Sequence, residues 1–446
     1  MTIFSLLKSF HFRPRMYGLV VICSLAFCFS YAFPVFYSLA QVVLALSITI
    51  LLADIVLLYV LDIQIRAERK TGNMLFLGDQ NTVSISLQSF LPLPLNAILY
   101  DELPVQLQER DFAIRIELRH RESQLIEYTI TPVSRGDYHF GRINIHVFSP
   151  LGLISRNIIG GREATVPCFP SIPQMKQFEL RAFSRASADQ GIKRIQRIGH
   201  SFEFEQIKSY VEGDNIRSIN WKATSRRGNL MVNQYQDERS QQVYCIIDKG
   251  RSMLMPFNGL SLLDYAINTS LVISNIALKK YDKAGLISFS DKLGTCLPAE
   301  RSRTQLRKIL RALYAEKERE TEADYTLLLN AIRNMGGSRS LLLLFSNFDS
   351  IYAMERILPV LRKINSYHLL VVIMFQDTEL EDFSLKDAAT TEDIYIQTLA
   401  NKLLADKQTM VQLLRKFGIQ VLLTRPEELS LRTVNKYLEI KSKGLI

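Results

Sequence analysis

The chain has 446 residues, enough for two or three domains of about 150 residues each, and 48% of them are hydrophobic, more than a soluble protein needs. Its net charge of +10 comes from basic residues spread along the chain, without the long basic block or aromatic-interleaved basic patch typical of nucleic-acid-binding proteins. The five cysteines have neither metal-ligand nor disulfide-framework spacing, which favours a reducing compartment.

The first apolar region, residues 16–63, predicts a transmembrane helical hairpin. Met16–Phe33 and Leu39–Ile63 each approach the roughly 20 residues that a helix needs to cross a bilayer. A cleaved signal peptide is not favoured, because a second apolar run follows at once. Basic residues flank both ends, so the positive-inside rule places residues 1–15 and everything after residue 66 in the cytoplasm. We therefore expect a multi-pass protein of the inner (cytoplasmic) membrane.

Asp54 is the carboxylate in the interior of the second apolar run, whose other aspartate, Asp62, stands at its end. A carboxylate inside a membrane segment is a functional hypothesis by default. One interpretation is a protonated or snorkelling side chain near the cytoplasmic end of the helix. The other is a contact with a partner or with a second copy of the chain.

Residues 70–168 predict a small β-sandwich domain. Short runs of alternating apolar and polar residues, separated by Pro-rich or Gly-centred turns, are typical of half-buried strands, and their spacing indicates an immunoglobulin-type sandwich. His139 and His146 lie in one predicted strand, Tyr138–Val147, an odd number of residues apart, so they should face opposite sides of the sheet. The domain is interpreted as a spacer or docking surface. Residues 181–200 predict a flexible connector or lid.

The segment 201–240 is interpreted as a structure that packs against the domain after it. Residues 212–214 (Glu-Gly-Asp) have turn chemistry, and Trp221 is the only tryptophan of the chain. The structural interpretation is a turn and strand that Trp221 holds on the next domain, with Asp214 paired to Arg217.

Residues 241–446 predict an α/β domain. Apolar, partly β-branched segments alternate with amphipathic helical segments, which is typical of a doubly wound, mostly parallel sheet. The first strand, Val243–Ile247, leads to Asp248-x-Gly250-x-Ser252, and the carboxyl ends of strands are where such sheets bind ligands. Neither the dinucleotide-binding glycine pattern nor the Walker phosphate-binding pattern occurs, so a nucleotide site is unsupported.

The Asp-x-Gly-x-Ser arrangement resembles the metal-ion-dependent adhesion motif of von Willebrand factor A domains, where a serine stands at the position of Gly250. The resemblance implies a von Willebrand factor A-like fold and a Mg²⁺ site built from three loops. The candidate ligands, one or two oxygen-bearing side chains from each loop, are Asp248, Ser252, Thr326, Asn347 and Asp349. Gly250 and Asn347 remove an oxygen and a charge, so we expect a degenerate site of reduced affinity. The alternative is that Asp248 and Ser252 cap turns and helix starts.

Residues 210–227 resemble the signature of the bacterial domain-of-unknown-function family fifty-eight. The pattern is Tyr-x-x-Gly-Asp-x-x-Arg-x-Ile-Asn-Trp-Lys-Ala followed by an arginine pair, and the signature or partner-binding candidates are Tyr210, Gly213, Asp214, Arg217, Asn220, Trp221 and Arg226. The order of membrane hairpin, β domain and A-type domain is also similar to that family. Its members are similar to proteins encoded beside MoxR-type AAA+ ATPases, so the resemblance implies such an ATPase as partner.

These observations favour a membrane-anchored adaptor whose A-type domain docks a protein partner on the cytoplasmic side. The competing hypothesis is a metal-dependent hydrolase that uses Asp248. Against it, no histidine lies near that loop in sequence, Cys245 belongs to the predicted core strand, and no nucleophile–base arrangement is apparent. A third hypothesis, a binder of nucleic acid or acidic lipid, predicts steep salt dependence and indifference to Asp248→Ala.

Overall fold

The computed structural model divides into two compact units, Met1–Phe169 and Pro170–Ile446. Most of the predicted connector 181–200 lies outside the residues that the structure describes. The residues that the structure describes are 9–60, 63–90, 94–119, 122–178, 198–212, 214, 216–236, 240–336, 338–385 and 390–445.

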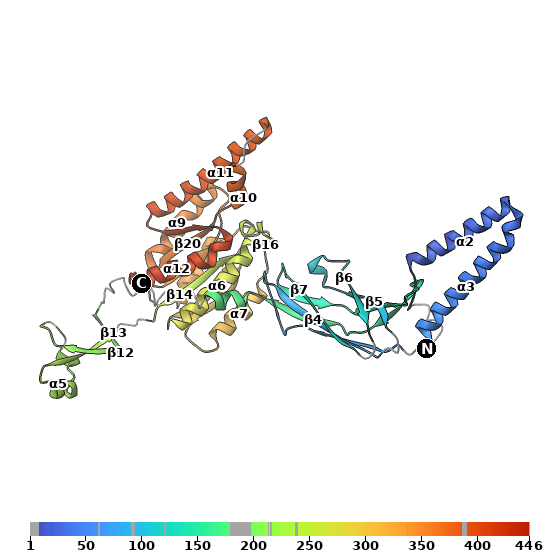
Figure 1. Ribbon diagram of the computed structural model, residues 1–446. Coiled ribbons are helices and arrows are strands. Elements are labelled where there is room, and N and C mark those ends of the chain that lie inside the picture. The colour runs from blue at the N-terminus through green and yellow to red at the C-terminus, as the bar shows by residue number, and fades with distance from the viewer. Residues whose placement is uncertain are drawn as a thin grey trace. The chain divides into compact units, whose positions relative to one another are not determined.

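Two apolar helices stand near the start of unit 1 (Figure 1). α2 (Pro14–Ala32) and α3 (Tyr37–Tyr59) are joined by the 3₁₀ turn η1 (Pro34–Phe36). Both are long and apolar enough to cross a membrane. Pro14 stands in the first turn of α2, where its missing N–H leaves no helical hydrogen bond unmade. The two helices lie where the sequence predicts the hairpin.

Asp54 contacts the β strands of its own chain. Its side chain is fully buried and accepts hydrogen bonds from Leu153 N at 3.0 Å, from Ile154 N at 3.1 Å, and from Ser149 Oγ. Beside it, Arg156 Nη1 donates to Leu58 O at 2.9 Å. Both interpretations of Asp54 from sequence missed this, because its partners lie about a hundred residues further along the chain.

Three sheets form the rest of unit 1, and all their strands except β1 follow the hairpin in the chain. Their strand orders are β1-β10-β9-β5-β6, β2-β4-β7 and β3-β11-β8. Burial alternates along the strands, as the period-two pattern predicts. The strands are β1 (Phe10–Phe12), β2 (Ile65–Lys70), β3 (Leu75–Phe76), β4 (Asn81–Ser89), β5 (Leu95–Asp101), β6 (Ala113–Leu118), β7 (Ser123–Ile130), β8 (Gly136–Phe140), β9 (Ile143–Phe148), β10 (Ile154–Ile159) and β11 (Ala164–Phe169).

The prediction of one strand over Tyr138–Val147 is wrong. The run breaks after Phe140, and its halves, β8 and β9, belong to different sheets. Gly141 turns away to donate its N–H to Glu102 O at 2.9 Å. His139 and His146 therefore do not share a sheet.

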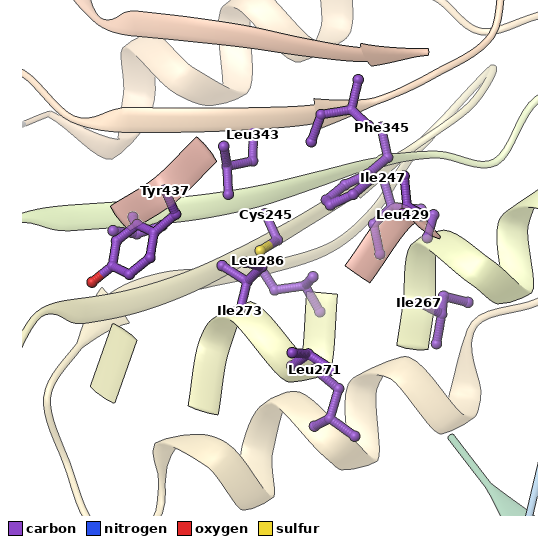
Figure 2. Packing of buried hydrophobic residues seen from close by; sticks show 14 of the residues in the cluster. Cys245, Ile247, Ile267, Leu271, Ile273, Leu286, Leu343, Phe345, Leu429 and Tyr437 are labelled. Carbon is purple, nitrogen blue, oxygen red and sulfur yellow. The ribbon is translucent and has the colours of Figure 1, made fainter. Parts of the chain in front are cut away.

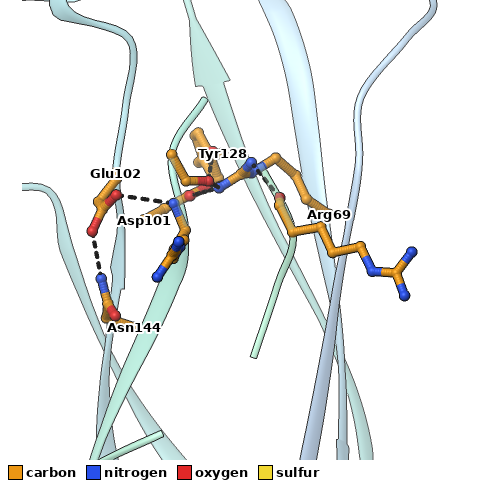
Figure 3. A network of polar contacts seen from close by, with 8 residues as sticks. Arg69, Asp101, Glu102, Tyr128 and Asn144 are labelled. Carbon is orange, nitrogen blue, oxygen red and sulfur yellow. Dashed lines mark hydrogen bonds and ion pairs between the residues drawn. The ribbon is translucent and has the colours of Figure 1, made fainter. Parts of the chain in front are cut away.

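A buried ion pair joins two of these sheets (Figure 3). Arg69 of β2 donates to both carboxylate oxygens of Asp101 in β5, with Nε 3.1 Å from Oδ2, and the two side chains are 2% and 0% exposed. Tyr128 of β7 donates to the same carboxylate at 2.5 Å, and Arg69 also donates to Gly141 O at 3.1 Å. Several donors thus satisfy the buried charge, which an ion pair removed from water requires.

Unit 2 contains a six-stranded sheet of order β18-β17-β14-β19-β20-β21, in which only β17 and β18 pair antiparallel. The mixed α/β class is confirmed. The strands are β14 (Gln242–Asp248), β17 (Lys283–Phe289), β18 (Leu293–Glu300), β19 (Leu341–Phe345), β20 (Leu369–Phe375) and β21 (Gln420–Thr424). The helices are α6 (Leu262–Lys279), α7 (Gln305–Ala315), α8 (Tyr325–Met335), α9 (Ile351–Tyr367), α10 (Thr378–Leu385), α11 (Thr391–Lys416) and α12 (Leu429–Ser442).

Helices cover both faces of this sheet and bury a core on each. Cys245, Ile247 and Leu343 face the side covered by α6, α7 and α12 (Figure 2), while Ile246 and Leu344 face α8, α9 and α11. Burial on both faces explains why the strands are continuous apolar runs. From β14, the chain first adds strands on one side and then on the other. Its carboxyl end is therefore a switch point, where open α/β sheets bind ligands.

A two-stranded antiparallel ribbon precedes the sheet in the chain. It consists of β12 (Ile198–Ser209) and β13 (Met231–Gln236). Between them lie the 3₁₀ turn η4 (Ile216–Ser218) and the short helix α5 (Trp221–Arg227). We refer to residues 198–236 as the signature module.

Candidate functional site

Asp248 ends β14 at the switch point and is 1% exposed. Its Oδ1 accepts a hydrogen bond from Gly250 N at 2.8 Å, and its Oδ2 accepts from Ser346 Oγ at 2.8 Å and from Tyr325 Oη at 3.0 Å. Burial raises the pKa of Asp248, and these three hydrogen bonds oppose that rise. Both carboxylate oxygens are therefore engaged by donors of the protein itself.

Tyr325 is the side chain that fills the space beside Asp248. Its ring packs at right angles against Phe289, with centroids 5.2 Å apart, and lies 6.3 Å from that of Phe348. Burial, and next the charge of Asp248, raise the pKa of Tyr325 well above its usual value. The phenol therefore stays protonated and donates.

Thr326, predicted as the hydroxyl ligand of the second loop, points away from Asp248. It is exposed, and its N–H caps the start of α8 by donating to Asp324 Oδ1 at 2.8 Å. Successive residues of a helix point about 100° apart, so Tyr325 faces the core when Thr326 faces solvent. The signal that identifies Tyr325 is helical periodicity, because it shares the buried face of α8 with Leu328, Leu329 and Ile332.

A charged segment, residues 316–324, lies across the carboxyl ends of β14 and β17. Its backbone is fixed by hydrogen bonds from Arg251 N to Thr321 O at 2.9 Å and from Asp324 N to Ser290 O at 2.9 Å. We call it the covering segment. It lies between Asp248 and the solvent-facing residues of this edge, which explains the burial of a carboxylate that the sequence places on a loop.

Gly250 allows the covering segment to approach. A Cβ at this position would lie 3.0 Å from Asp248 Oδ1, 3.1 Å from Ala323 N and 3.1 Å from Thr321 O. Its φ of −71° is ordinary, so the glycine serves close packing and not an unusual backbone conformation. The oxygen absent from the adhesion-type motif is thus replaced by backbone of the covering segment.

Lys249 and Glu316 form a buried ion pair that no sequence pattern indicated. Nζ and Oε2 are 2.6 Å apart, and the side chains are 8% and 4% exposed. Ser288 Oγ donates to Oε1 of Glu316 at 2.5 Å. Burial raises the pKa of Glu316, but hydrogen bonds from Lys249 and Ser288 outweigh it, so the pKa is lowered. The pair anchors the covering segment to the end of β14.

Exposed charges of both signs surround this buried centre. Arg251 lies 3.7 Å from Glu322 and 3.7 Å from Asp349, and Arg356 lies 2.9 Å from Glu322. All four side chains are more than half exposed, so these pairs add little stability. We call these four residues the charged rim. Their head groups are available to a partner.

The five predicted Mg²⁺ ligands do not form a Mg²⁺ donor set in this arrangement. Asp248 already accepts three hydrogen bonds from protein donors, Thr326 is exposed, Asp349 belongs to the charged rim, and Ser252 is half-buried. Asn347 is 7% exposed, and its Oδ1 has no hydrogen-bond partner. Within the described ranges, no three His, Cys, Asp or Glu side chains converge. Because Mg²⁺ demands near-octahedral oxygen coordination, the residues present do not fit the ion, and we derive no chemistry through it.

The pocket beside Asn347 is too small for a cofactor. It encloses about 10 Å³, which is room for one water molecule. Lys407 of α11 lines it and donates to Phe375 O at 2.6 Å. Burial lowers the pKa of this lysine.

Asp214 is the first of two predicted signature residues that hold the signature module together. Asp214 accepts from Lys208 Nζ at 2.9 Å and from Val211 N at 3.0 Å. The hydrogen bond from Lys208 lowers the pKa of Asp214. The side chain of Arg217, the predicted partner of Asp214, is not among the described parts of the chain. Gly213 also lies outside the described residues.

Asn220 caps helix α5 and ties it to the strands. Its Oδ1 accepts from Ala223 N at 3.0 Å, and its Nδ2 donates to Asn233 Oδ1 at 2.8 Å. Tyr210 is half-buried, and its backbone N–H donates to Leu230 O at 2.8 Å. Asparagine suits this position because its side-chain oxygen can cap the helix while its amide donates to Asn233.

The prediction that Trp221 holds this segment on the next domain is wrong. Trp221 is the first residue of α5 and is 70% exposed. Arg226, in the last turn, is also exposed. The module therefore presents its tryptophan to solvent.

Residues 206–413 match the model of a family described as a protein of unknown function, DUF58. Over these residues the chain belongs to the DUF58 family. The match includes most of the signature module and of the six-stranded sheet. The uncharacterized protein YeaD of Bacillus subtilis (strain 168) is 24% identical over 272 residues, which are 59% of this chain and 65% of YeaD.

Solved structures resemble this DUF58 protein only weakly. The CARDB domain of a Pyrococcus furiosus protein is 11% identical with a TM-score of 0.17, covering 24% of this chain and 88% of that domain. An uncharacterized membrane spanning protein from Vibrio fischeri is 12% identical with a TM-score of 0.17, covering 45% and 98%. Scores this low carry no conclusion about fold or function.

Proposed function

We propose that this DUF58 protein is a membrane-anchored adaptor whose α/β domain docks a protein partner at the carboxyl edge of its six-stranded sheet. The observation that supports this best is the charged rim of that edge, whose four side chains are more than half exposed. Asp248 itself lies buried. Both of its oxygens accept hydrogen bonds from protein donors beneath the covering segment. It is therefore a structural group, and the hydrolase hypothesis, which needs a reachable carboxylate, has no observation in its favour.

The charged rim is the proposed contact surface. Its alternating signs, Arg251 and Arg356 against Glu322 and Asp349, favour a partner with complementary charges, because exposed charges set specificity and association rate more than affinity. The rim stands on the strand ends and on a segment fixed by the Lys249–Glu316 pair. A rigid base of this kind reduces the entropy lost on binding.

The proposed fold of residues 241–446 is von Willebrand factor A-like, and that of residues 70–168 a β-sandwich. The parallel central strand β14, its neighbours on either side and the Asp-x-Gly-x-Ser turn support the first assignment. In this DUF58 protein, Tyr325 would take the space that a metal and its waters take in an adhesion-type site. Docking would then need no ion.

The proposed partner is a MoxR-type AAA+ ATPase, with the DUF58 domains in the cytoplasm. The family signature supports the partner, and the basic residues flanking α2 and α3 support the orientation. The two helices support the membrane anchor.

The test is binding of the full chain, in nanodiscs, to the purified MoxR-type ATPase of the same organism. Reversing two rim charges, Arg251→Glu and Arg356→Glu, should weaken binding by about tenfold or more. Arg432→Glu, on α12 and 51% exposed, is the matched control and should not change it. Equal affinity of the wild type and the rim variants would contradict the docking surface, and no binding of the wild type would contradict the partner.

A further inference from the structure

A second surface lies on the outer face of the five-stranded sheet in unit 1. His146 of β9 lies opposite Ile98 of β5, which in turn lies opposite Arg115 of β6. Directly opposed residues point to the same side of a sheet. The alternate residues, Ile145 and Leu99, are 0% exposed. The side chains of His146 and Arg115 therefore lie on the outer face, away from the core.

Residues before α2 join this face. The ring of His11 lies 5.0 Å from that of His146, and the ring of Tyr100 lies 5.1 Å from it. The guanidinium of Arg13 lies over the ring of Phe148, 3.6 Å from its centroid. Arg13 thus lies on an aromatic ring of this surface, an arrangement that holds its guanidinium in place.

Arg13 and Arg15 converge at the start of α2. A methyl carbon built on Gly152 would lie 3.5 Å from Arg13 Nη1 and 3.2 Å from Arg15 Nη1. Arg15 donates to Pro150 O at 3.3 Å and to Leu151 O at 3.2 Å. Among the described residues, neither guanidinium forms an ion pair with a carboxylate. Burial lowers the pKa of Arg13, and the charges of Arg15 and Arg115 lower it further.

We propose that this surface binds the phosphate of an anionic phospholipid headgroup, with Arg13, Arg15 and Arg115 as its ligands. The planar guanidinium donates two parallel hydrogen bonds to phosphate. Arg13, Arg15 and Arg115 outnumber the carboxylate of Glu117, which lies on the same face of β6 two residues after Arg115, so the surface keeps a positive field that an anion relieves.

A lipid is the occupant that the position of the site selects. Arg13 and Arg15 flank Pro14, the first residue of α2, which is long and apolar enough to cross a membrane. Phe12, beside them, is 52% exposed, as suits an aromatic ring at the membrane interface. The proposal depends on the membrane anchor and is independent of partner docking at unit 2.

Arg115 distinguishes a specific headgroup site from the general attraction of basic residues beside a membrane helix to an anionic bilayer. Arg13 and Arg15 would favour an anionic bilayer wherever they stood near α2. Arg115 lies in a strand of the folded domain, and contributes only if a headgroup is bound against the outer face of the sheet.

The test is native mass spectrometry of the full chain released from detergent with phosphatidylglycerol or phosphatidylcholine. Wild type should retain phosphatidylglycerol in preference, and Arg115→Gln should lower that retention by about fivefold, the effect of one basic residue near a membrane surface. Arg119→Gln is the matched control, because Arg119 follows the same strand and is 67% exposed. A thermal melt confirms that each variant is folded.

Three outcomes decide the proposal. A loss in Arg115→Gln that Arg119→Gln does not show supports it, as does intermediate retention in Arg115→Lys, which keeps the charge but not the fork. Equal retention by wild type and Arg115→Gln overturns it. If inorganic phosphate displaces the lipid completely, the site recognises the free ion and the assignment to a headgroup is wrong.

Discussion

Tyr325 Oη donates a hydrogen bond to Asp248 Oδ2 at 3.0 Å, between residues 77 positions apart in the chain. This contact joins the start of α8 to the end of β14 at the switch point of the sheet. It also decides how the carboxylate functions, since an aspartate held by a buried phenol is a structural element. The docking surface that we propose is built above it.

Removing the phenol should leave Asp248 short of a donor. We expect Tyr325→Phe to lower the free energy of unfolding by about 1.5–3 kcal/mol, the contribution of a hydrogen bond to a charged group, while Ser346 still donates to Oδ2. Urea denaturation measures this. Tyr352→Phe is the control, because Tyr352 is 83% exposed, and it should change stability little. An unchanged free energy in Tyr325→Phe would mean that the hydrogen bond contributes nothing.

Restoring the usual serine of the adhesion motif should not create a metal site. In Gly250→Ser, the new Cβ would crowd the backbone at Thr321 and Ala323. We expect a loss of about 1–3 kcal/mol from overpacking and no gain of Mg²⁺ binding by calorimetry. A variant that is as stable as wild type and binds Mg²⁺ would contradict this, because the covering segment must then move to admit the serine.

Asp54 should fix the loop before β10 to α3. Asp54→Asn keeps one oxygen that can accept from Leu153 N and Ile154 N while its NH₂ faces Ser149 Oγ, but it removes the negative charge that strengthens these hydrogen bonds. We expect these two amides to exchange with deuterium about tenfold faster or more, as a lost charge-assisted hydrogen bond implies. Hydrogen exchange of the full chain in nanodiscs measures the rates, with Asp111→Asn, an exposed position, as control. Unchanged exchange at both amides would contradict the contact.

The covering segment should stay attached in mild acid. Hydrogen bonds from Ser290, from Arg319 at 2.9 Å and from Thr321, together with the charge of Arg319, outweigh the effect of burial and lower the pKa of Asp291 to about 2. Since the folded pKa lies below the unfolded value of 3.8, the stabilisation is present above that pH and is lost as the pH falls towards 2. Carbon-13 NMR of the Asp291 carboxyl should show this low midpoint. Arg319→Gln should raise it, and a wild-type midpoint near 3.8 would contradict the attachment.

Much of the α/β domain is predictable because its strands are buried on both faces. Leu341–Phe345 is wholly apolar, and the long helix expected over Glu392–Phe417 is α11, within a residue at each end. Local pattern fails where the chain turns abruptly, as at Gly141. There the hydrogen bond from Gly141 N to Glu102 O ends the strand, although apolar and polar residues alternate both before and after this point.

The candidate site was less predictable, because its key contacts are not local. Asp248 is evident from sequence as the residue that ends the first strand. Its burial depends on the covering segment, which the Lys249–Glu316 pair holds across 67 residues of chain. The choice of Thr326 as the second-loop ligand placed a solvent-facing hydroxyl in the site, whereas helical periodicity indicates Tyr325 on the buried face of α8.

The proposed docking surface depends most on Asp248 being held by the protein and not by a metal. Electron paramagnetic resonance of Mn²⁺, a stand-in for Mg²⁺, tests this directly on the full chain in nanodiscs. We predict no bound Mn²⁺ that is sensitive to Ser252→Ala or Asp349→Ala. A bound ion that either substitution releases would contradict the account and restore the metal-dependent site.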